Sequence, residues 1–233
     1  MAQTTTAEQL MARPADVGET NAERRMGDSA SPGTRLLAAG APLMLAGVEL
    51  FHPHPHDVFD VDLTRWMAVH YAQIALFPLA AWSQAVLVEE QPGYAPAICQ
   101  LAMFVFAISY VAFDTSAGVV TGLLVRAARL TNSPEIWRAP VLAIWTHPVM
   151  GGNSDGTPAL VIIGTMAWLI GTLCCAWAVR RAGHSWRPVA FLIVSAFGLF
   201  VFRTHAWPGG PVTFGSLALA AWLVERERRR FSG

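Results

Sequence analysis

The stretch PALVIIGTMAWLIGTLCCAWAV, residues 158–179, contains no charged side chain and is followed directly by Arg180 and Arg181. A helix needs about 20 mostly apolar residues to cross the hydrocarbon core of a membrane, so this stretch is long enough to span. Comparable apolar stretches recur along the chain. They predict an all-α integral membrane protein, a bundle of about six transmembrane helices at residues 35–52, 65–88, 95–125, 158–179, 188–203 and 211–225.

The composition agrees with a membrane protein. Of the 233 residues, 54% are hydrophobic and 14% are charged, whereas about a quarter of the residues in a soluble domain are charged. The formal net charge is zero, so there is no overall basic field that would attract nucleic acid. We therefore expect the lipid bilayer as the main partner, with a homo-oligomer or a larger membrane complex as the hypotheses for protein partners.

The arginines indicate how the chain is oriented. All 16 basic residues are arginine, and most of them lie before residue 36, between residues 180 and 187, or after residue 225. Cytoplasmic loops carry an excess of basic residues, so both termini are expected in the cytoplasm of a multi-pass protein of the cell (inner) membrane. Residues 1–34 are predicted to be a disordered cytoplasmic tail, and residues 226–233 a basic one.

Two short regions qualify this topology. Ser133-Pro134-Glu135 is typical of a helix start, and the apolar residues that follow it, 136–146, are too few to span. They predict a short interfacial or re-entrant helix between the third and fourth spans. The last two spans are short, and a single re-entrant hairpin around the turn at residues 207–211 is the alternative to two crossings.

Histidines are concentrated in the loops that this topology places on the outer side. In the stretch HPHPH, residues 52–56, three histidines alternate with prolines that hold the backbone extended. Two more loops contribute His147 and His205. Neutral imidazole is a common ligand of zinc, copper, nickel and iron. The pattern favours a site for a transition metal, while a solvated turn at the end of a helix is the alternative.

Glu49, His70 and Asp114 are ionisable residues inside predicted spans, all in the half that this topology places toward the outer side. A charged side chain near the bilayer centre costs at least about 2.5–3.5 kcal/mol, so such residues usually face the bundle interior. Helical spacing places His70 on one face with Trp66, Gln73 and Phe77. Asp114 belongs to a second predicted stripe, which consists of Gln100, Phe104, Ala107, Val111, Asp114, Gly118 and Thr121.

These residues lead to a hypothesis and two alternatives. The favoured function is a protein that handles a transition metal or depends on one, with a histidine and carboxylate site at the extracytoplasmic face. The predicted metal ligands are Glu49, His52, His54, His56, His70, Asp114, His147 and His205. The alternatives are a non-catalytic accessory or assembly subunit of a membrane complex, and a small transporter coupled to protons or cations through Asp114 and Glu49.

The motifs that the sequence lacks limit the reactions that can be assigned to it. The chain has no Walker loop, no dinucleotide fingerprint, and neither an HExxH nor a GxSxG motif, so no catalytic residue is assigned. Copper, zinc, iron and nickel remain open as the metal. Haem is disfavoured, because bis-histidine ligation needs two facing histidines and only His70 lies well inside a predicted span.

Several further residues have structural interpretations. Trp66, Trp186, Trp207 and Trp222 are expected as anchors at the membrane interface, and His184 as part of a basic loop that faces lipid. The cysteines, Cys99, Cys174 and Cys175, are expected to be small buried hydrophobic residues. Gly118 and Gly122 form a GxxxG pattern that suits close packing of helices. ELFHP at 49–53 followed by WMAVH at 66–70 resembles a pattern in bacterial multi-pass proteins, and this resemblance implies no activity.

Overall fold

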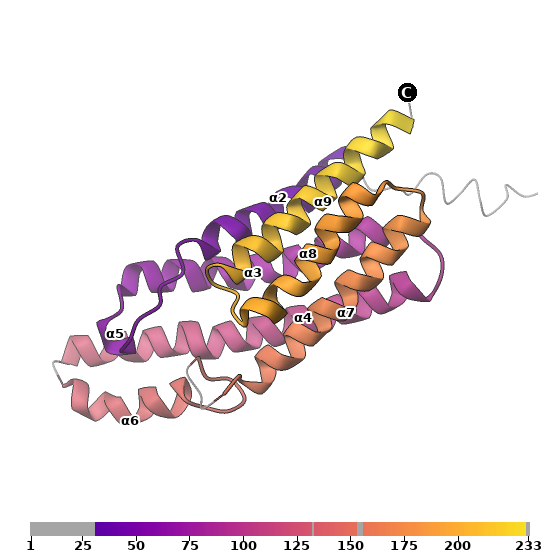
Figure 1. The fold of residues 1–233 in the computed structure, drawn as a ribbon. Coiled ribbons are helices and arrows are strands. Elements are labelled where there is room, and N and C mark those ends of the chain that lie inside the picture. Colours follow the sequence, from indigo (N-terminus) through magenta and orange to yellow (C-terminus); the bar gives the residue numbers. More distant parts are fainter. Residues whose placement is uncertain (1–30, 132, 153–155, 232–233) are drawn as a thin grey trace, which may run out of the picture. The chain divides into compact units, whose positions relative to one another are not determined.

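The computed structural model describes residues 31–131, 133–152 and 156–231, and these residues form helices and loops without a strand. The predicted all-α class is therefore confirmed (Figure 1). Most of the predicted N-terminal tail and the last two residues lie outside the described part. The helical elements are α2 (Pro32–Glu49), η2 (Val58–Asp60), α3 (Leu63–Val88), α4 (Tyr94–Phe113), η3 (Asp114–Val120), α5 (Thr121–Thr131), α6 (Pro134–Trp145), α7 (Ala159–Arg181), α8 (Trp186–Phe202) and α9 (Gly209–Phe231).

Within the part of the chain that the structure describes, three helical segments are long and apolar enough to cross a membrane: Leu63–Val88, Tyr94–Thr131 and Ala159–Arg181. The second of them comprises α4, η3 and α5, which follow one another without a break. The apolar helix α8 is shorter. Helix α9 continues past the predicted limit of residue 225 into the charged sequence ERERRR.

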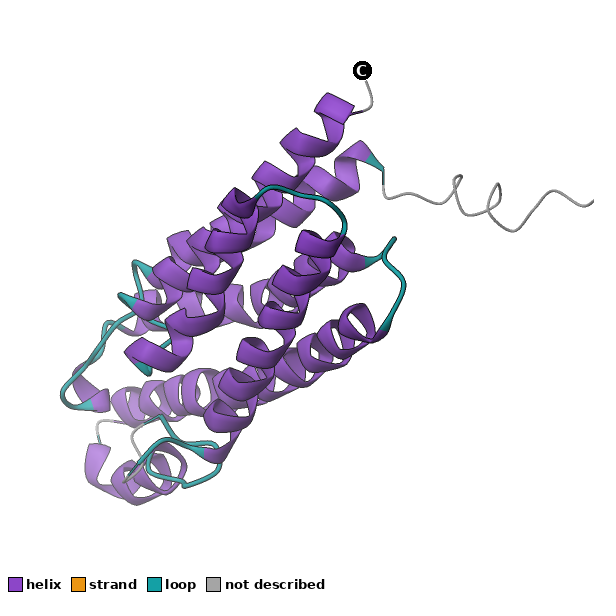
Figure 2. Ribbon diagram, turned by 45° about the vertical axis from the view of Figure 1, so that its right-hand side comes forward, coloured by secondary structure: helices purple, strands orange, loops and turns teal. Residues whose placement is uncertain are grey.

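Six segments pack as a closed ring in the order of the chain. The contacting pairs are α2 with α3, α3 with α4, α4 with α7, α7 with α8, α8 with α9, and α9 with α2. Each segment runs opposite to the one before it, with connecting loops at the two ends (Figure 2). The core between them is apolar and contains fully buried large side chains such as Phe77, Phe106, Trp168 and Phe214.

The two ends of the ring differ in their charged residues. At one end, which we call the arginine end, Arg35 lies 3.2 Å from Glu90 and 3.7 Å from Glu225. Helix α2 begins and helix α9 ends at this end (Figure 1). At the opposite end, which we call the histidine end, α2 leads into the HPHPH segment and α8 leads into the turn at residues 203–208.

His184 is also at the arginine end, and the prediction that it belongs to a lipid-facing loop was wrong. Its ring is buried, and Nδ1 lies 3.0 Å from Glu227 Oε2. The same carboxylate accepts hydrogen bonds from the Ser185 backbone N–H and hydroxyl. Burial raises the pKa of Glu227, but these hydrogen bonds and the His184 ring outweigh it, so the net shift of the pKa is downward. His184 thus connects the α7–α8 turn to α9.

The predicted stripe around Asp114 is wrong in its first part, which lies in α4, and right after Asp114. Gln100 and Phe104 are exposed, whereas Cys99, Met103 and Phe106 are buried. The reason is η3, a π-helical turn at Asp114–Val120. A π-turn inserts an extra residue into the helix, so the buried face before it is displaced by one position from the buried face after it, where Asp114, Gly118 and Thr121 do lie.

The GxxxG pattern is used for packing within the chain. A Cβ atom on Gly118 would lie 1.9 Å from His70 Cδ2, and one on Gly122 would lie 2.5 Å from Met67 Sδ. Both glycines therefore allow α3 to approach η3 and α5 closely, as small residues do at helix contacts in membranes. Trp66 stabilises the same contact, because its Nε1 donates a hydrogen bond of 2.8 Å to the Gly118 carbonyl.

Candidate functional site

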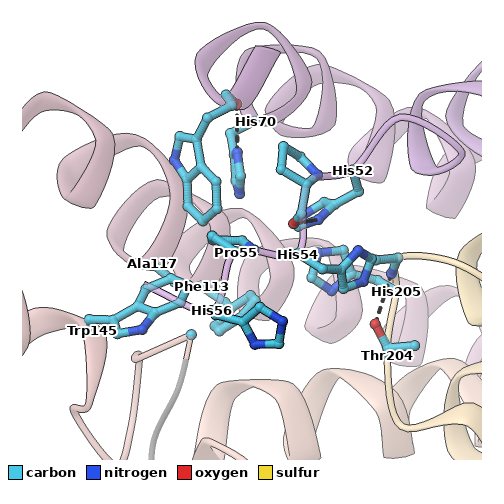
Figure 3. Close-up of a pocket in the computed structure, with 14 residues that line it drawn as sticks. His52, His54, Pro55, His56, His70, Phe113, Ala117, Trp145, Thr204 and His205 are labelled. Carbon is cyan, nitrogen blue, oxygen red and sulfur yellow. Dashed lines mark hydrogen bonds between the residues drawn. The ribbon is translucent and has the colours of Figure 1, made fainter. Parts of the chain in front are cut away.

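A cavity of about 380 Å³ opens at the histidine end (Figure 3). Five of the seven histidines line it, together with aromatic, proline and small residues. The lining residues come from the loop after α2, from α3, from the α4–η3 segment, from α6 and the loop after it, and from the turn after α8: His52, Pro53, His54, Pro55, His56, Trp66, His70, Phe113, Ala117, Trp145, Gly152, Thr204, His205 and Ala206.

Polar contacts of the backbone hold the HPHPH segment over the cavity. Helix α2 ends in a turn in which the Phe51 N–H donates to the Val48 carbonyl. The Phe51 carbonyl then accepts a hydrogen bond of 2.6 Å from Arg65 Nε at the start of α3. Beyond the histidines, Arg129 of α5 donates to the carbonyls of Phe59 and Val61. The loop is therefore held at its start by an arginine of α3 and at its end by an arginine of α5.

His70 projects into the cavity from the second turn of α3 (Figure 3). Its Nδ1 lies 2.7 Å from the Trp66 carbonyl. A carbonyl oxygen can only accept, so Nδ1 carries the hydrogen and Nε2 keeps a lone pair in the neutral ring. The ring packs against Gly118, which fixes its position from the other side.

His52 occupies the centre of the histidine group. Its ring centroid lies 5.0 Å from that of His70, 5.0 Å from that of His205 and 5.6 Å from that of His54. Nδ1 donates a hydrogen bond of 2.9 Å to the Pro53 carbonyl, whereas Nε2 is buried and has no hydrogen-bond partner among the described residues. His52 thus has the same tautomer as His70, with an unused lone pair on Nε2.

His205 enters the group from the turn between α8 and α9. Its ring is surrounded by the aromatic rings of Phe77, Tyr110 and Phe113, at centroid distances of 5.8–5.9 Å. Its Nε2 faces Asp114 Oδ1 at 3.8 Å, which is too long for a hydrogen bond. Within the described residues neither oxygen of Asp114 has a hydrogen-bond partner, although the side chain is buried.

Burial keeps the imidazoles of His205 and His52 neutral. It lowers the pKa of His205 to about 3, with repulsion from His70 and His54 adding to the effect. Burial also lowers the pKa of His52 well below its usual value, and repulsion from His205 and His70 again contributes. Since the neutral ring is the form that binds a metal, both side chains are available as ligands throughout the physiological pH range.

Glu49 lies behind the cavity and does not line it. Gln73 Nε2 donates a hydrogen bond of 2.9 Å to Glu49 Oε1, and Oε2 has no partner among the residues described. Gly210 packs closely on this side chain and on the His205 carbonyl, because a Cβ there would lie 2.6 Å from Glu49 Cγ and 1.7 Å from that oxygen. Glu49 therefore supports the turn that carries His205.

The structure thus places most of the predicted site residues at the cavity or directly behind it, and it places one of them, His147, elsewhere. His52, His54, His56, His70 and His205 line the cavity, while Glu49 and Asp114 lie behind it. His147 is not among the lining residues, and its Nδ1 accepts a hydrogen bond from the Val149 N–H in a turn after α6. Within residues 31–131, 133–152 and 156–231, no three histidine, cysteine or acidic side chains are already arranged to hold a metal ion.

Two tryptophans of the cavity wall had no predicted role there. Trp66 was expected as an interface anchor, but it is 2% exposed, and its ring lies 5.7 Å from that of Trp145. Trp186, Trp207 and Trp222, by contrast, are all exposed at helix ends or on the helix surface. The spacing of four residues between Trp66 and His70 had already indicated that both lie on one helical face, and the burial of Trp66 agrees with that indication and not with a role as an anchor.

Comparison of the chain with protein-family models, with curated proteins and with solved structures found no match.

Proposed function

We propose that this protein binds one transition-metal ion, copper, zinc, iron or nickel, through His52, His70 and His205. One observation carries the proposal: three imidazoles from separate parts of the chain meet at one cavity, with the His52 ring 5.0 Å from each of the other two. A metal bound through nitrogen at about 2.0–2.1 Å in tetrahedral geometry brings the centroids of two imidazole ligands to roughly 5 Å from each other. The spacing therefore suits a common ion.

The hydrogen bonds around the three rings also support a metal. Metal-binding histidines usually donate their second N–H to a carbonyl or carboxylate, which fixes the tautomer and the ring orientation. His52 and His70 make such bonds to the carbonyls of Pro53 and Trp66, and this leaves Nε2 of each for the ion. For His205, the Asp114 oxygen at 3.8 Å would become the corresponding acceptor once the two groups closed to hydrogen-bond distance, and Nδ1 would then be the ligand atom.

A metal would also relieve an energetic cost of the empty arrangement. Buried polar atoms normally have a partner, and leaving one without costs about 1–3 kcal/mol. One orphaned atom at this site is His52 Nε2, which the ion would take as a ligand atom. His54, which is exposed and 5.6 Å from His52, is the candidate fourth ligand.

The proposal includes a topology of six spans: α2, α3, α4 with η3 and α5, α7, α8 and α9. The arginine end and both termini would be cytoplasmic, and the metal would bind at the extracytoplasmic end. Two observations support this: three of these segments have the length and apolar character of membrane spans, and all six are neighbours in one antiparallel ring. Helix α6 packs back on α5 through Val141 and Val125, as an interfacial helix would.

The test is elemental analysis by mass spectrometry of detergent-purified protein after reconstitution with each of the four metals. We expect close to one metal ion per chain in the wild type and none in the double variant His52→Ala/His70→Ala. The matched control is His184→Ala, a buried histidine at the arginine end, which should keep the metal. No metal in the wild type under any condition, with no haem absorption, would overturn the proposal.

An accessory or assembly subunit is the second candidate. The observation in its favour is the α5–α6 hairpin, which extends beyond the ring (Figure 1) and exposes Leu130 and Ile136 to 74% each. Such a surface suits a partner subunit in the membrane interface. This candidate predicts that the double histidine variant keeps its function in the cell. The transporter alternative instead predicts loss of function in Asp114→Asn and Glu49→Gln, with no bound transition metal.

A further inference from the structure

A second, separate hollow of about 140 Å³ lies on the surface between α7 and α8, and its residues take no part in the histidine site. The walls are mainly apolar, and two of the wall residues, Ile162 and Phe200, are about half exposed. We call this hollow the α7–α8 groove. It is lined by Thr157, Val161, Ile162, Thr165, Met166, Leu199, Phe200 and Arg203.

The groove changes from polar to apolar along the helices. Thr157 precedes α7 and Arg203 follows α8, so both lie at the histidine end. The apolar residues Val161, Met166 and Leu199 lie one or more turns further into the helices. A molecule that fitted this arrangement would have a polar group at the end of the bundle and an apolar part along the helices, which is the arrangement of a lipid in a membrane.

Two features of Arg203 indicate a role for its side chain. It ends α8 with a φ of 54°, in the left-handed region, where its N–H donates to the Leu199 carbonyl. Glycine is the usual residue at this position, because other residues are strained there. The Arg203 guanidinium has no hydrogen bond or ion pair with any other residue in the described part of the chain. A strained, unpaired arginine that lines a groove points to an anionic ligand.

We propose that the α7–α8 groove binds one phospholipid with an anionic headgroup. The guanidinium of Arg203 would bind the phosphate, for which its planar fork of donors is well suited, and Thr157 would stand beside the headgroup. An acyl chain would lie along Val161, Ile162 and Phe200. Free phosphate would leave this apolar part unused. The inference does not rest on the metal site.

The test is native mass spectrometry of the protein purified from bilayers that contain equal amounts of phosphatidylglycerol and phosphatidylcholine. We expect the wild type to retain one phosphatidylglycerol per chain. Arg203→Gly should lose it without losing stability, because glycine adopts the left-handed conformation freely. Ile162→Trp fills the groove from its exposed wall and should lose the lipid while it keeps the charge.

Arg187→Gln is the matched control, since it removes an exposed arginine from the opposite end of the same helix. It should retain the lipid that Arg203→Gly loses. Retention of phosphatidylglycerol by both groove variants would overturn the proposal. Equal retention of phosphatidylcholine by the wild type would overturn the assignment of an anionic headgroup.

Discussion

Asp114 is the residue whose effect on the proposed metal site is easiest to separate from the fold. Its carboxylate lies 3.8 Å from His205 Nε2 and has no hydrogen-bond partner among the described residues, so replacement by its isostere breaks no existing bond. A carboxylate that orients a metal-binding histidine contributes about 10–100-fold to affinity. We therefore expect Asp114→Asn to weaken metal binding by about this factor, measured by competition with a chromophoric chelator.

Glu49→Gln is the control for this variant. Glu49 is equally buried, but it is held by Gln73 and does not line the cavity, so metal affinity should stay within about twofold of the wild type. Unchanged affinity in Asp114→Asn would show that Asp114 does not position His205. An equal loss in both variants would instead indicate a general effect of the buried carboxylates on the bundle.

The burial of single site residues was predictable where the membrane makes a polar side chain costly. His70 and Asp114 were identified because polar side chains inside a span must face the interior, and the structure buries both. The positions of His147 and His205 depend on which loops meet, and the sequence of one loop contains no information about its neighbours. Proline alternation grouped His52, His54 and His56, but it could not distinguish the partly buried His52 from the exposed His54 and His56.

At the scale of elements, the contact between α3 and η3 is the most sensitive part of the site. Gly118→Ala would place a Cβ atom 1.9 Å from His70 Cδ2, and the ring has little room to move because Nδ1 is bonded to the Trp66 carbonyl. Overpacking of this kind typically costs about 1–3 kcal/mol. We expect a lower thermal unfolding midpoint in detergent, together with loss of the bound metal.

Gly47→Ala in α2 is the matched control, because nothing lies within 4 Å of a Cβ at that position. Alanine is the better helix former by about 0.5–1 kcal/mol, so this variant should be as stable as the wild type or slightly more stable. If Gly118→Ala behaved in the same way and kept the metal, the close contact between His70 and η3 would not matter to the site.

The helices themselves were predictable, because long apolar stretches bounded by arginine, proline and glycine leave few alternatives. The π-turn was not. A regular period of 3.6 residues carried through Asp114 assigns Gln100 and Phe104 to the interior, whereas the structure exposes both. The additional residue in η3 has no clear sequence signature, and it is what turns both Phe113 and Asp114 toward the histidine end.

At the scale of the whole molecule, the antiparallel ring separates two chemically different ends. The arginine end has ion pairs between α2, the turn after α3, and α9, through Arg35, Glu90, Glu225 and Arg228. The histidine end has five imidazoles around a cavity. Because basic residues stay on the cytoplasmic side, the proposed topology predicts that a reagent outside the cell reaches only the histidine end.

Single-cysteine labelling tests this orientation. In a variant with Cys99, Cys174 and Cys175 replaced by alanine, we expect His54→Cys to react with a membrane-impermeant maleimide in intact cells. His54 is exposed at the histidine end, and Ala182 is exposed in the α7–α8 turn at the arginine end. Ala182→Cys should react only after the cells are opened. Labelling of Ala182→Cys in intact cells, with protection of His54→Cys, would invert the topology and place the proposed metal site on the cytoplasmic side.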